Sequence, residues 1–182
     1  MTDILQTIEE IISKQHDFKV NAVGGAYLLE EKKESNYPQT LVKQHGKMLI
    51  YSFDVENSNE IIFPIFNATY PKSTSISDYI IFYPKNGVLY TFICEQKSSS
   101  ASAKLQVEAG WLLADYIVKT VRRMLNFKEI KVEYRALIFS LSKTSQFASN
   151  PAKEPYIILS NSHLKNKLLR AGDICFLDNL CF

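Results

Sequence analysis

The feature that most constrains the fold is a pair of apolar segments joined by an Asn-Gly turn. Residues 78–83 (DYIIFY) and 88–94 (VLYTFIC) are rich in aromatic and β-branched residues, which favour strands. The connecting residues 84–87 (PKNG) contain the strongest short signal for a β-hairpin. The hairpin therefore places Asp78, which begins the first strand, at the same open end as Glu95, which follows the second.

The segment after the hairpin predicts a long helix and then another strand. Apolar residues recur at helical spacing from 103 to 125, and residues 131–141 (KVEYRALIFSL) have strand composition. A strand–helix–strand crossover joins parallel strands, whereas the hairpin is antiparallel. We therefore expect an α/β fold with a mixed β-sheet flanked by helices.

The remaining segments are expected to complete one domain, which suits a chain of 182 residues. Helical spacing over residues 3–15 predicts a first helix, and Gly24-Gly25 indicates a turn into a strand. The core is expected to cover about residues 2–141, and residues 142–182 form a strand–helix–strand extension. The other predicted elements are strands over 47–55, 60–66, 156–159 and 173–177, and a basic helix over 162–170.

The hairpin mouth carries the residues that point most clearly to chemistry. Glu95 and Lys97 share one face of a strand because side chains alternate with a period of two, and Gln96 points to the other face. Asp78 can reach the same place from across the mouth. Carboxylates and a main-chain carbonyl are the hard oxygen ligands that Mg²⁺ prefers, so Asp78, Glu95 and the carbonyl of Gln96 form a candidate metal site.

A metal held there would activate water for phosphodiester cleavage, and Lys97 could orient that water or stabilise developing negative charge. A simple surface ion pair between Glu95 and Lys97 is the competing interpretation. Asp54, at the end of a strand-like run, is a weaker candidate for a second acid, because entry into a loop explains it better.

The elements Ser77-Asp78 and Glu95-Gln96-Lys97, in the order helix, strands, hairpin, helix, strand, resemble the PD-(D/E)XK nuclease superfamily. The resemblance covers roughly residues 2–141 and implies the restriction-endonuclease-like fold. It implies a nuclease, either an endonuclease or an exonuclease, that is, a hydrolase that uses Mg²⁺ or Mn²⁺ to cleave phosphodiester bonds in DNA or sometimes in RNA. A role in defence against foreign DNA or in DNA repair would suit such a protein.

The resemblance also implies further site residues. An acid on the first core helix is common in the family, and Glu9 is the candidate for this metal ligand, with Glu10 second. A polar residue after the lysine is common too, and Gln106 is the candidate for positioning water or phosphate. Two positions depart from the family: Ser77 stands where proline is usual, and Gly110 stands where one branch has the tyrosine of a Gln-x-x-x-Tyr signature.

Basic residues in the second half of the chain are candidates for binding nucleic acid. The formal net charge of +2 neither requires nor excludes a nucleic-acid partner, so the argument for binding depends on local clusters of basic residues. Phosphate contacts by such clusters would make binding salt-dependent, although solvated helix faces explain the same pattern. The first cluster is Lys119, Arg122, Arg123 and Lys128, and the second is Lys165, Lys167 and Arg170.

Other functions remain open at this level. A catalytically inactive module of the same fold would bind nucleic acid or a partner protein, and a small assembly protein would bind no nucleic acid. The small size favours a homodimer or a larger complex. The first residues lack a basic signal-peptide region and no apolar run approaches about 20 residues, so we expect a cytoplasmic protein without membrane contact.

Overall fold

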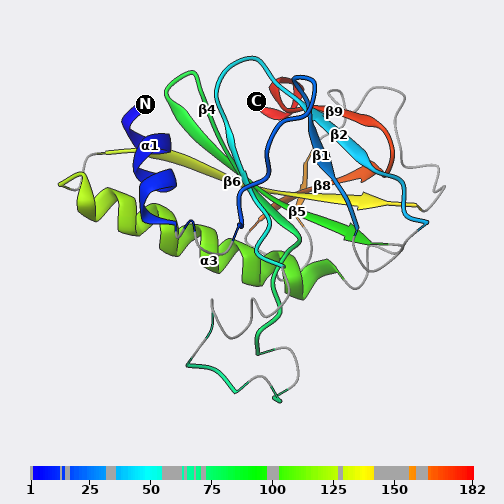
Figure 1. Cartoon of the computed structure of the whole chain (residues 1–182), viewed down its shortest axis with the longest axis horizontal. Coiled ribbons are helices and arrows are strands. Elements are labelled where there is room, and N and C mark those ends of the chain that lie inside the picture. The colour runs from blue at the N-terminus through cyan, green and yellow to red at the C-terminus, as the bar shows by residue number, and fades with distance from the viewer. Residues whose placement is uncertain are drawn as a thin grey trace.

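The computed structural model is a mixed α/β arrangement with helices on one side and strands in two sheets (Figure 1). Among the residues that the structure describes, no helix is long and apolar enough to cross a membrane. The structure describes residues 2–12, 14, 17–31, 36–54, 63, 65–67, 69–70, 73–97, 103–126, 129–141, 156–158 and 164–182. Its elements are α1 (Thr2–Ile11), β1 (Tyr27–Leu29), β2 (Thr40–Lys43), β3 (Leu49–Tyr51), β4 (Tyr79–Lys85), β5 (Val88–Lys97), α3 (Ala103–Met124), β6 (Lys131–Ser140), β7 (Ile157–Ile158), β8 (Lys165–Arg170), β9 (Ile174–Phe176) and the 3₁₀ turn η4 (Leu177–Leu180).

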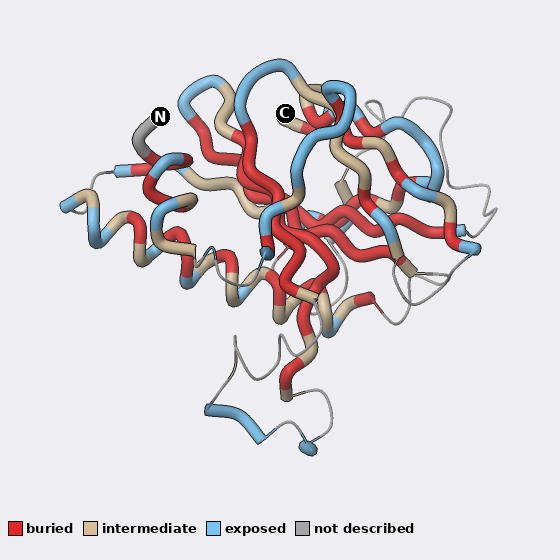
Figure 2. Tube along the Cα trace, in the orientation of Figure 1, coloured by how far each residue is buried: buried red, intermediate tan, exposed pale blue. Residues whose placement is uncertain are grey.

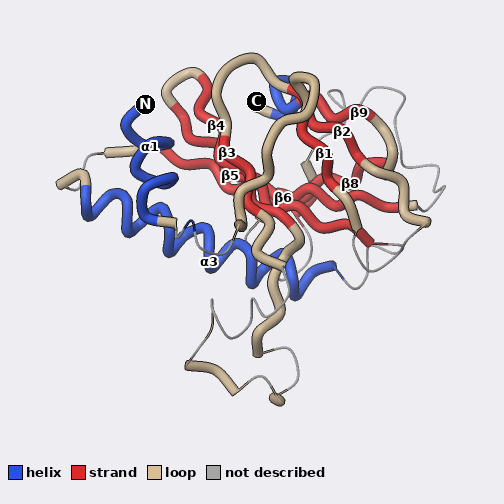
Figure 3. The backbone as a smooth tube through the Cα atoms, in the orientation of Figure 1, coloured by secondary structure: helices blue, strands red, loops and turns tan. Residues whose placement is uncertain are grey.

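The larger sheet has six strands in the order β3-β4-β5-β6-β8-β7. Its first three strands pair antiparallel, and β5, β6 and β8 are parallel to one another. The helix α3 makes the crossover between β5 and β6, so the predicted parallel pairing and the predicted mixed sheet are confirmed. A smaller sheet contains β1, β2 and β9 in that order (Figure 3). In this sheet β1 pairs antiparallel and β9 parallel to β2.

The large sheet lies between two apolar layers, and most of its central strands are buried (Figure 2). Along β4, Ile80 and Phe82 pack with residues of α1 and α3, while Tyr79, Ile81 and Tyr83 pack toward the smaller sheet. Each fully buried side chain of this size contributes about 1.5–3 kcal/mol from removal of apolar surface from water. Burial on both faces explains why β4 and β5 read as continuous apolar runs rather than as alternating patterns.

The hairpin turn forms as its sequence predicts. Asn86 and Gly87 have φ angles of 51° and 81°, and two consecutive left-handed residues are the geometry that Asn-Gly adopts readily in a tight hairpin. Pro84 and Lys85 belong to β4 rather than to the turn. The register pairs Tyr79 with Cys94, which leaves Asp78 just beyond the last pair, opposite Glu95.

The predicted basic helix over residues 162–170 is wrong, because residues 165–170 form strand β8. This segment pairs in parallel with β6, and its side chains alternate between the two faces of the sheet. Lys167 is only 2% exposed, and its ammonium lies 5.1 Å from the ring centre of Tyr156. Pairing with β6 therefore overrides the composition that favoured a basic helix, and Lys167 cannot belong to an exposed basic face.

Other boundaries also differ from the sequence predictions. The strand predicted over 47–55 is limited to β3, and β2 was not predicted. Within the predicted strand 60–66, Phe66 donates its N–H to the carbonyl of Phe63, a turn rather than a strand, while residues 60–62 and Pro64 lie outside the described residues. The first helix ends at Ile11 rather than at residue 15.

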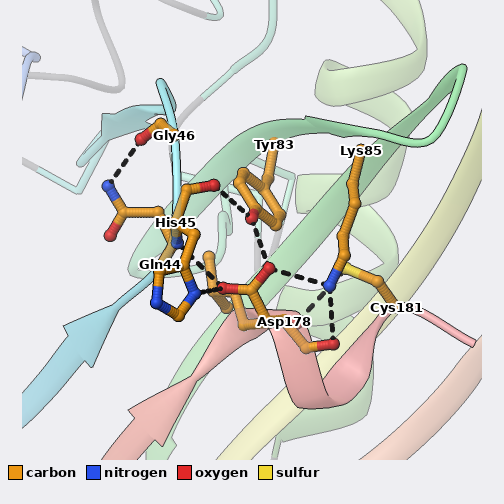
Figure 4. A network of polar contacts seen from close by, with 8 residues as sticks. Gln44, His45, Gly46, Tyr83, Lys85, Asp178 and Cys181 are labelled. Atoms are coloured by element: carbon orange, nitrogen blue, oxygen red, sulfur yellow. Dashed lines mark hydrogen bonds and ion pairs between the residues drawn. The ribbon is translucent and has the colours of Figure 1, made fainter.

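The C-terminal segment is built into the core rather than attached to it. Strand β8 joins the large sheet and β9 joins the small one. Asp178 in η4 accepts hydrogen bonds from the main-chain N–H of His45 (2.8 Å) and from the ammonium of Lys85 (2.7 Å), and the hydroxyl of Tyr83 lies 2.7 Å from it (Figure 4). This network ties the end of the chain to the turn end of the hairpin, opposite the end that carries Asp78.

Candidate active site

Asp78 lies immediately before β4 and is buried, with 7% of its surface exposed. Its Oδ2 accepts a hydrogen bond of 2.6 Å from the main-chain N–H of Gln96 in β5. Because β4 begins only at Tyr79, the carboxylate takes the place that a further residue of β4 would occupy beside β5. The hairpin thus fixes the Asp78 side chain at the open edge of β5.

Glu95 and Lys97 lie on the same face of β5, as the alternation of a strand predicts. Glu95 is fully buried, and its Oε1 lies 3.1 Å from the ammonium of Lys97. Its Oε2 accepts a hydrogen bond of 3.3 Å from the main-chain N–H of Asp78. Asp78 is therefore held by the main chain of β5, and Glu95 by the main chain of Asp78 itself.

The main-chain carbonyl of Gln96 belongs to the same edge. The N–H and C=O of one residue in a strand point to the same side, and the N–H of Gln96 points to Asp78. The side chain of Gln96 points to the opposite face of the sheet, as predicted, where its Nε2 donates to the carbonyl of Leu29 (3.2 Å). Two carboxylates and one carbonyl thus converge at the hairpin mouth.

The electrostatics of the site favour added positive charge. Burial raises the pKa of Asp78, the nearby charges of Glu31 and Asp54 raise it further, and the hydrogen bond from Gln96 opposes them. Burial and the charge of Asp78 likewise raise the pKa of Glu95, against the effect of Lys97. Burial lowers the pKa of Lys97, but the carboxylates of Glu95, Asp78 and Glu31 outweigh it and the net shift is upward. A single lysine therefore faces several acids.

A divalent cation fits this set of donors. Among the described residues, no three His, Cys, Asp or Glu side chains lie close enough to hold a metal by themselves. Magnesium does not need such a cage, because it keeps several of its waters and binds through one or two carboxylates. Among the described residues, Glu95 Oε1 contacts the Lys97 ammonium in an ion pair of 3.1 Å, and a carboxylate oxygen with one such partner retains coordination capacity.

The helix α3 approaches the site through its first turns. The amide of Gln106 is 3.5 Å from the carbonyl of Ile76, two residues before Asp78, so the predicted water- or phosphate-positioning residue lies beside the site. One turn later, Gly110 packs on Ser77: an added Cβ would lie 2.1 Å from Ser77 Oγ. The absence of a side chain at 110 therefore lets the helix approach the segment that carries Asp78.

Glu9, the predicted metal ligand on α1, is engaged elsewhere. It forms an ion pair with Lys19, which lowers its pKa, and 41% of each side chain is exposed. The acids whose charges act on Asp78 are instead Glu31 and Asp54. Asp54 was a weak candidate from its position after a strand-like run, but nothing in the sequence singled out Glu31.

The predicted basic residues do not form one surface. Lys119 pairs with Asp115 (2.6 Å), and helical rise places Arg122 about 24 Å along α3 from Gln106. In contrast, Arg170 is in register with Ser140, which is in register with Lys97. Arg170 therefore lies at the same end of the sheet as Lys97, two strands away. Arg123 and Lys165 are exposed, and Lys128 lies outside the described residues.

Comparisons with protein-family models, curated proteins and solved structures find no match.

Proposed function

We propose that this protein is a metal-dependent nuclease that hydrolyses phosphodiester bonds in nucleic acid, with DNA as the foremost substrate and a restriction-endonuclease-like core. The observation that carries the proposal is the convergence of Asp78, Glu95 and Lys97 at the hairpin mouth through reciprocal main-chain contacts. The order α1, β1–β5, α3, β6 supports it, because the hairpin β4–β5, which brings Asp78 and Glu95 together, is followed by a helix and a parallel strand, the order on which the resemblance rests.

The chain's own residues supply orientation and charge. The hydrogen bond from Gln96 holds Asp78, and the contacts with Lys97 and the Asp78 N–H hold Glu95. Rigid support of this kind keeps a catalytic carboxylate in one geometry and avoids reorganisation during the reaction. A bound divalent cation would lower the pKa of a water and neutralise charge on the phosphate. Lys97 places an additional positive charge where the phosphate becomes more negative.

Burial of two acids around one lysine makes a purely structural role costly. Two buried carboxylates in one site repel each other, and such pairs occur mainly where function requires them. The charge balance of the site suits a cation better than an anion, so substrate phosphate would be bound together with the metal. The same balance disfavours an inactive module that binds nucleic acid through these residues alone.

The test is cleavage of supercoiled plasmid and of labelled DNA and RNA oligonucleotides with Mg²⁺ or Mn²⁺, against a chelator control. We expect Asp78→Asn and Lys97→Met to lower the cleavage rate by about 10²-fold or more, as loss of a charge-stabilising group does. Glu129→Gln is the matched control, since Glu129 is an exposed acid between α3 and β6 that has no proposed role in the site. Full cleavage by Asp78→Ala and Lys97→Ala would show that these residues are wrongly assigned, and metal-independent binding without cleavage would favour the inactive module.

A further inference from the structure

Helix α3 exposes apolar side chains along the face that points away from the large sheet. Leu105, Leu112 and Tyr116 are 48%, 60% and 69% exposed, and their spacings of seven and four residues place them on one line along the helix. The side chains that α3 buries, among them Val107 and Ala114, lie on the opposite face. The helix lies along the outside of the sheet (Figure 1), so this line does not belong to the core of the chain.

The line continues as a regular seam over most of α3. An exposed leucine by itself means little, because folded proteins expose many apolar atoms. A seam that advances by alternate steps of four and three residues, in contrast, is the pattern by which one helix packs against another. From its first to its last position the seam extends about 27 Å, at 1.5 Å per residue. Its six positions are Leu105, Ala109, Leu112, Tyr116, Lys119 and Arg123.

The charges of the seam select the direction in which a second copy of the same helix can pack. In a parallel pair, Lys119 and Arg123 would each face the same basic residue of the other copy, and like charges repel. In an antiparallel pair centred on Ala114, Leu112 faces Tyr116 of the second copy, and both basic residues face the apolar first half of the seam. The antiparallel pair therefore avoids contact between like charges within the seam.

The charged residues beside the seam complement each other in the antiparallel pair. Glu108 and Arg122 flank the seam on the same side, and neither forms an ion pair within the described part of the chain. The antiparallel arrangement brings Glu108 of one copy beside Arg122 of the other, and the two-fold axis repeats this ion pair. Asp115 would meet its own copy near the axis, but Lys119 already balances its charge at 2.6 Å, and the hydroxyl of Tyr134 donates to it at 3.2 Å.

We propose that α3 is the interface of a symmetric homodimer in which two copies of this helix pack antiparallel, with Leu112 against Tyr116 at the centre and Glu108 paired with Arg122 at each end. The inference does not depend on the proposed nuclease function. A single helix seam buries less surface than a standard interface of about 800 Å² per partner. We therefore expect a dissociation constant in the micromolar range, about 1–50 µM.

The test is sedimentation equilibrium of the full chain at concentrations from about 1 to 200 µM, a range that brackets the expected dissociation constant. Leu112→Glu puts a charge at the centre of the seam in both copies and should weaken the dimer tenfold or more. Val23→Glu is the matched control, because Val23 is an exposed apolar residue outside α3, and it should dimerise like the wild type. Circular dichroism shows that both variants are folded. A wild type that stays monomeric up to 200 µM, or a Leu112→Glu variant that dimerises equally well, would overturn the inference and leave the seam to a partner of another sequence.

Charge reversal tests the identity of the partner and the direction of packing. Glu108→Arg and Arg122→Glu should each weaken the dimer about fivefold or more at low salt, because each places like charges together at both ends of the interface, and salt should reduce the loss. The double variant Glu108→Arg/Arg122→Glu restores both ion pairs with their signs exchanged and should dimerise nearly like the wild type. If the double variant is as weak as the single ones, or the single variants dimerise like the wild type, the antiparallel interface is wrong.

Discussion

Gly110 on α3 lies directly against Ser77, the residue before Asp78, so closely that a Cβ at 110 would also stand 2.8 Å from the Cβ of Ser77. Ser77 is fully buried. The two positions are those at which the sequence departs from the family that it resembles. Their contact means that the missing side chain at 110 leaves room for the serine before Asp78.

Gly110→Ala is therefore expected to destabilise the protein by about 2 kcal/mol, although alanine is the better helix former by about 1 kcal/mol. The clash falls on buried atoms of Ser77 and Ile93, which have no free space to move into. Urea unfolding followed by circular dichroism measures the effect. Ser77→Ala is the companion change: alone it should be close to neutral, because Ser77 Oγ has no hydrogen-bond partner among the described residues. Combined with Gly110→Ala it should recover part of the loss.

The pH dependence of the free energy of unfolding should reveal the cost of burying the charged carboxylate of Asp78. The folded pKa of Asp78 lies above its unfolded value, so around neutral pH the folded state binds more protons than the unfolded one. The free energy of unfolding therefore falls as pH rises above about 4 and levels off above the folded pKa. Asp78→Asn removes this penalty and should stabilise the protein by about 2 kcal/mol at pH 8, with little difference at pH 4.

Glu9 provides a control of opposite sign in the same measurements. Lys19 lowers the folded pKa of Glu9, so the stability that this acid contributes is present above its unfolded pKa and is lost as pH falls through the folded one. Glu9→Gln should therefore be slightly less stable than wild type at pH 8 and equal to it at low pH. If Asp78→Asn, like Glu9→Gln, were less stable than wild type at pH 8, the proposed cost of the buried Asp78 charge would be contradicted.

The extent to which the site could be predicted depends on how locally each residue is placed. Asp78, Glu95 and Lys97 were predictable because a tight Asn-Gly turn and the two-residue period of strands fix them relative to one another. The effect of the Glu31 charge on Asp78 was not, because Glu31 is far from Asp78 in the sequence. The residues just before Glu31 contact the hairpin over long separations: Glu30 and Tyr79 are 49 residues apart, and Leu29 and Gln96 are 67 apart. Side-chain contacts with distant main chain leave no periodic signal in the sequence.

The same reason separates the well-predicted elements from the others. The long helix and the hairpin carry their own periodicity and turn chemistry, and both formed within a few residues of the expected bounds. Strand β8 pairs in parallel with a strand some 30 residues earlier, and the register joins Arg135 to Lys165. Its one buried cation, Lys167, lies against the aromatic rings of Tyr156 and Phe182, which both lie outside the segment. Composition alone therefore favoured a basic helix.

The Asp178 network should contribute substantially to stability. Asp178→Asn leaves the ammonium of Lys85 and the N–H of His45 with weaker acceptors, and a loss of about 1–3 kcal/mol is expected near neutral pH. Hydrogen bonds from Lys85, Tyr83 and His45 outweigh burial and hold the pKa of Asp178 below its ordinary value. Its stabilisation is therefore present above the unfolded pKa and is lost as acid protonates it. Urea unfolding at pH 7 and pH 3 should show the difference shrinking in acid, and an equal loss at both would contradict the ion-pair account.

Nucleic-acid binding should depend on Arg170 more than on Lys165, although both are exposed cations of β8. Arg170 lies at the Lys97 end of the sheet, whereas Lys165 is in register with Arg135, five residues or about 17 Å earlier along the strand. In the Asp78→Asn background, which prevents cleavage from interfering, Arg170→Gln should weaken binding of labelled duplex DNA. It should also reduce the slope of log affinity against log salt by about 0.9, the value for one lost phosphate contact. Fluorescence anisotropy measures both the affinity and the salt slope, and Lys165→Gln should change neither of them. Equal effects of the two substitutions would mean that bound DNA does not run along the end of the sheet that carries Lys97.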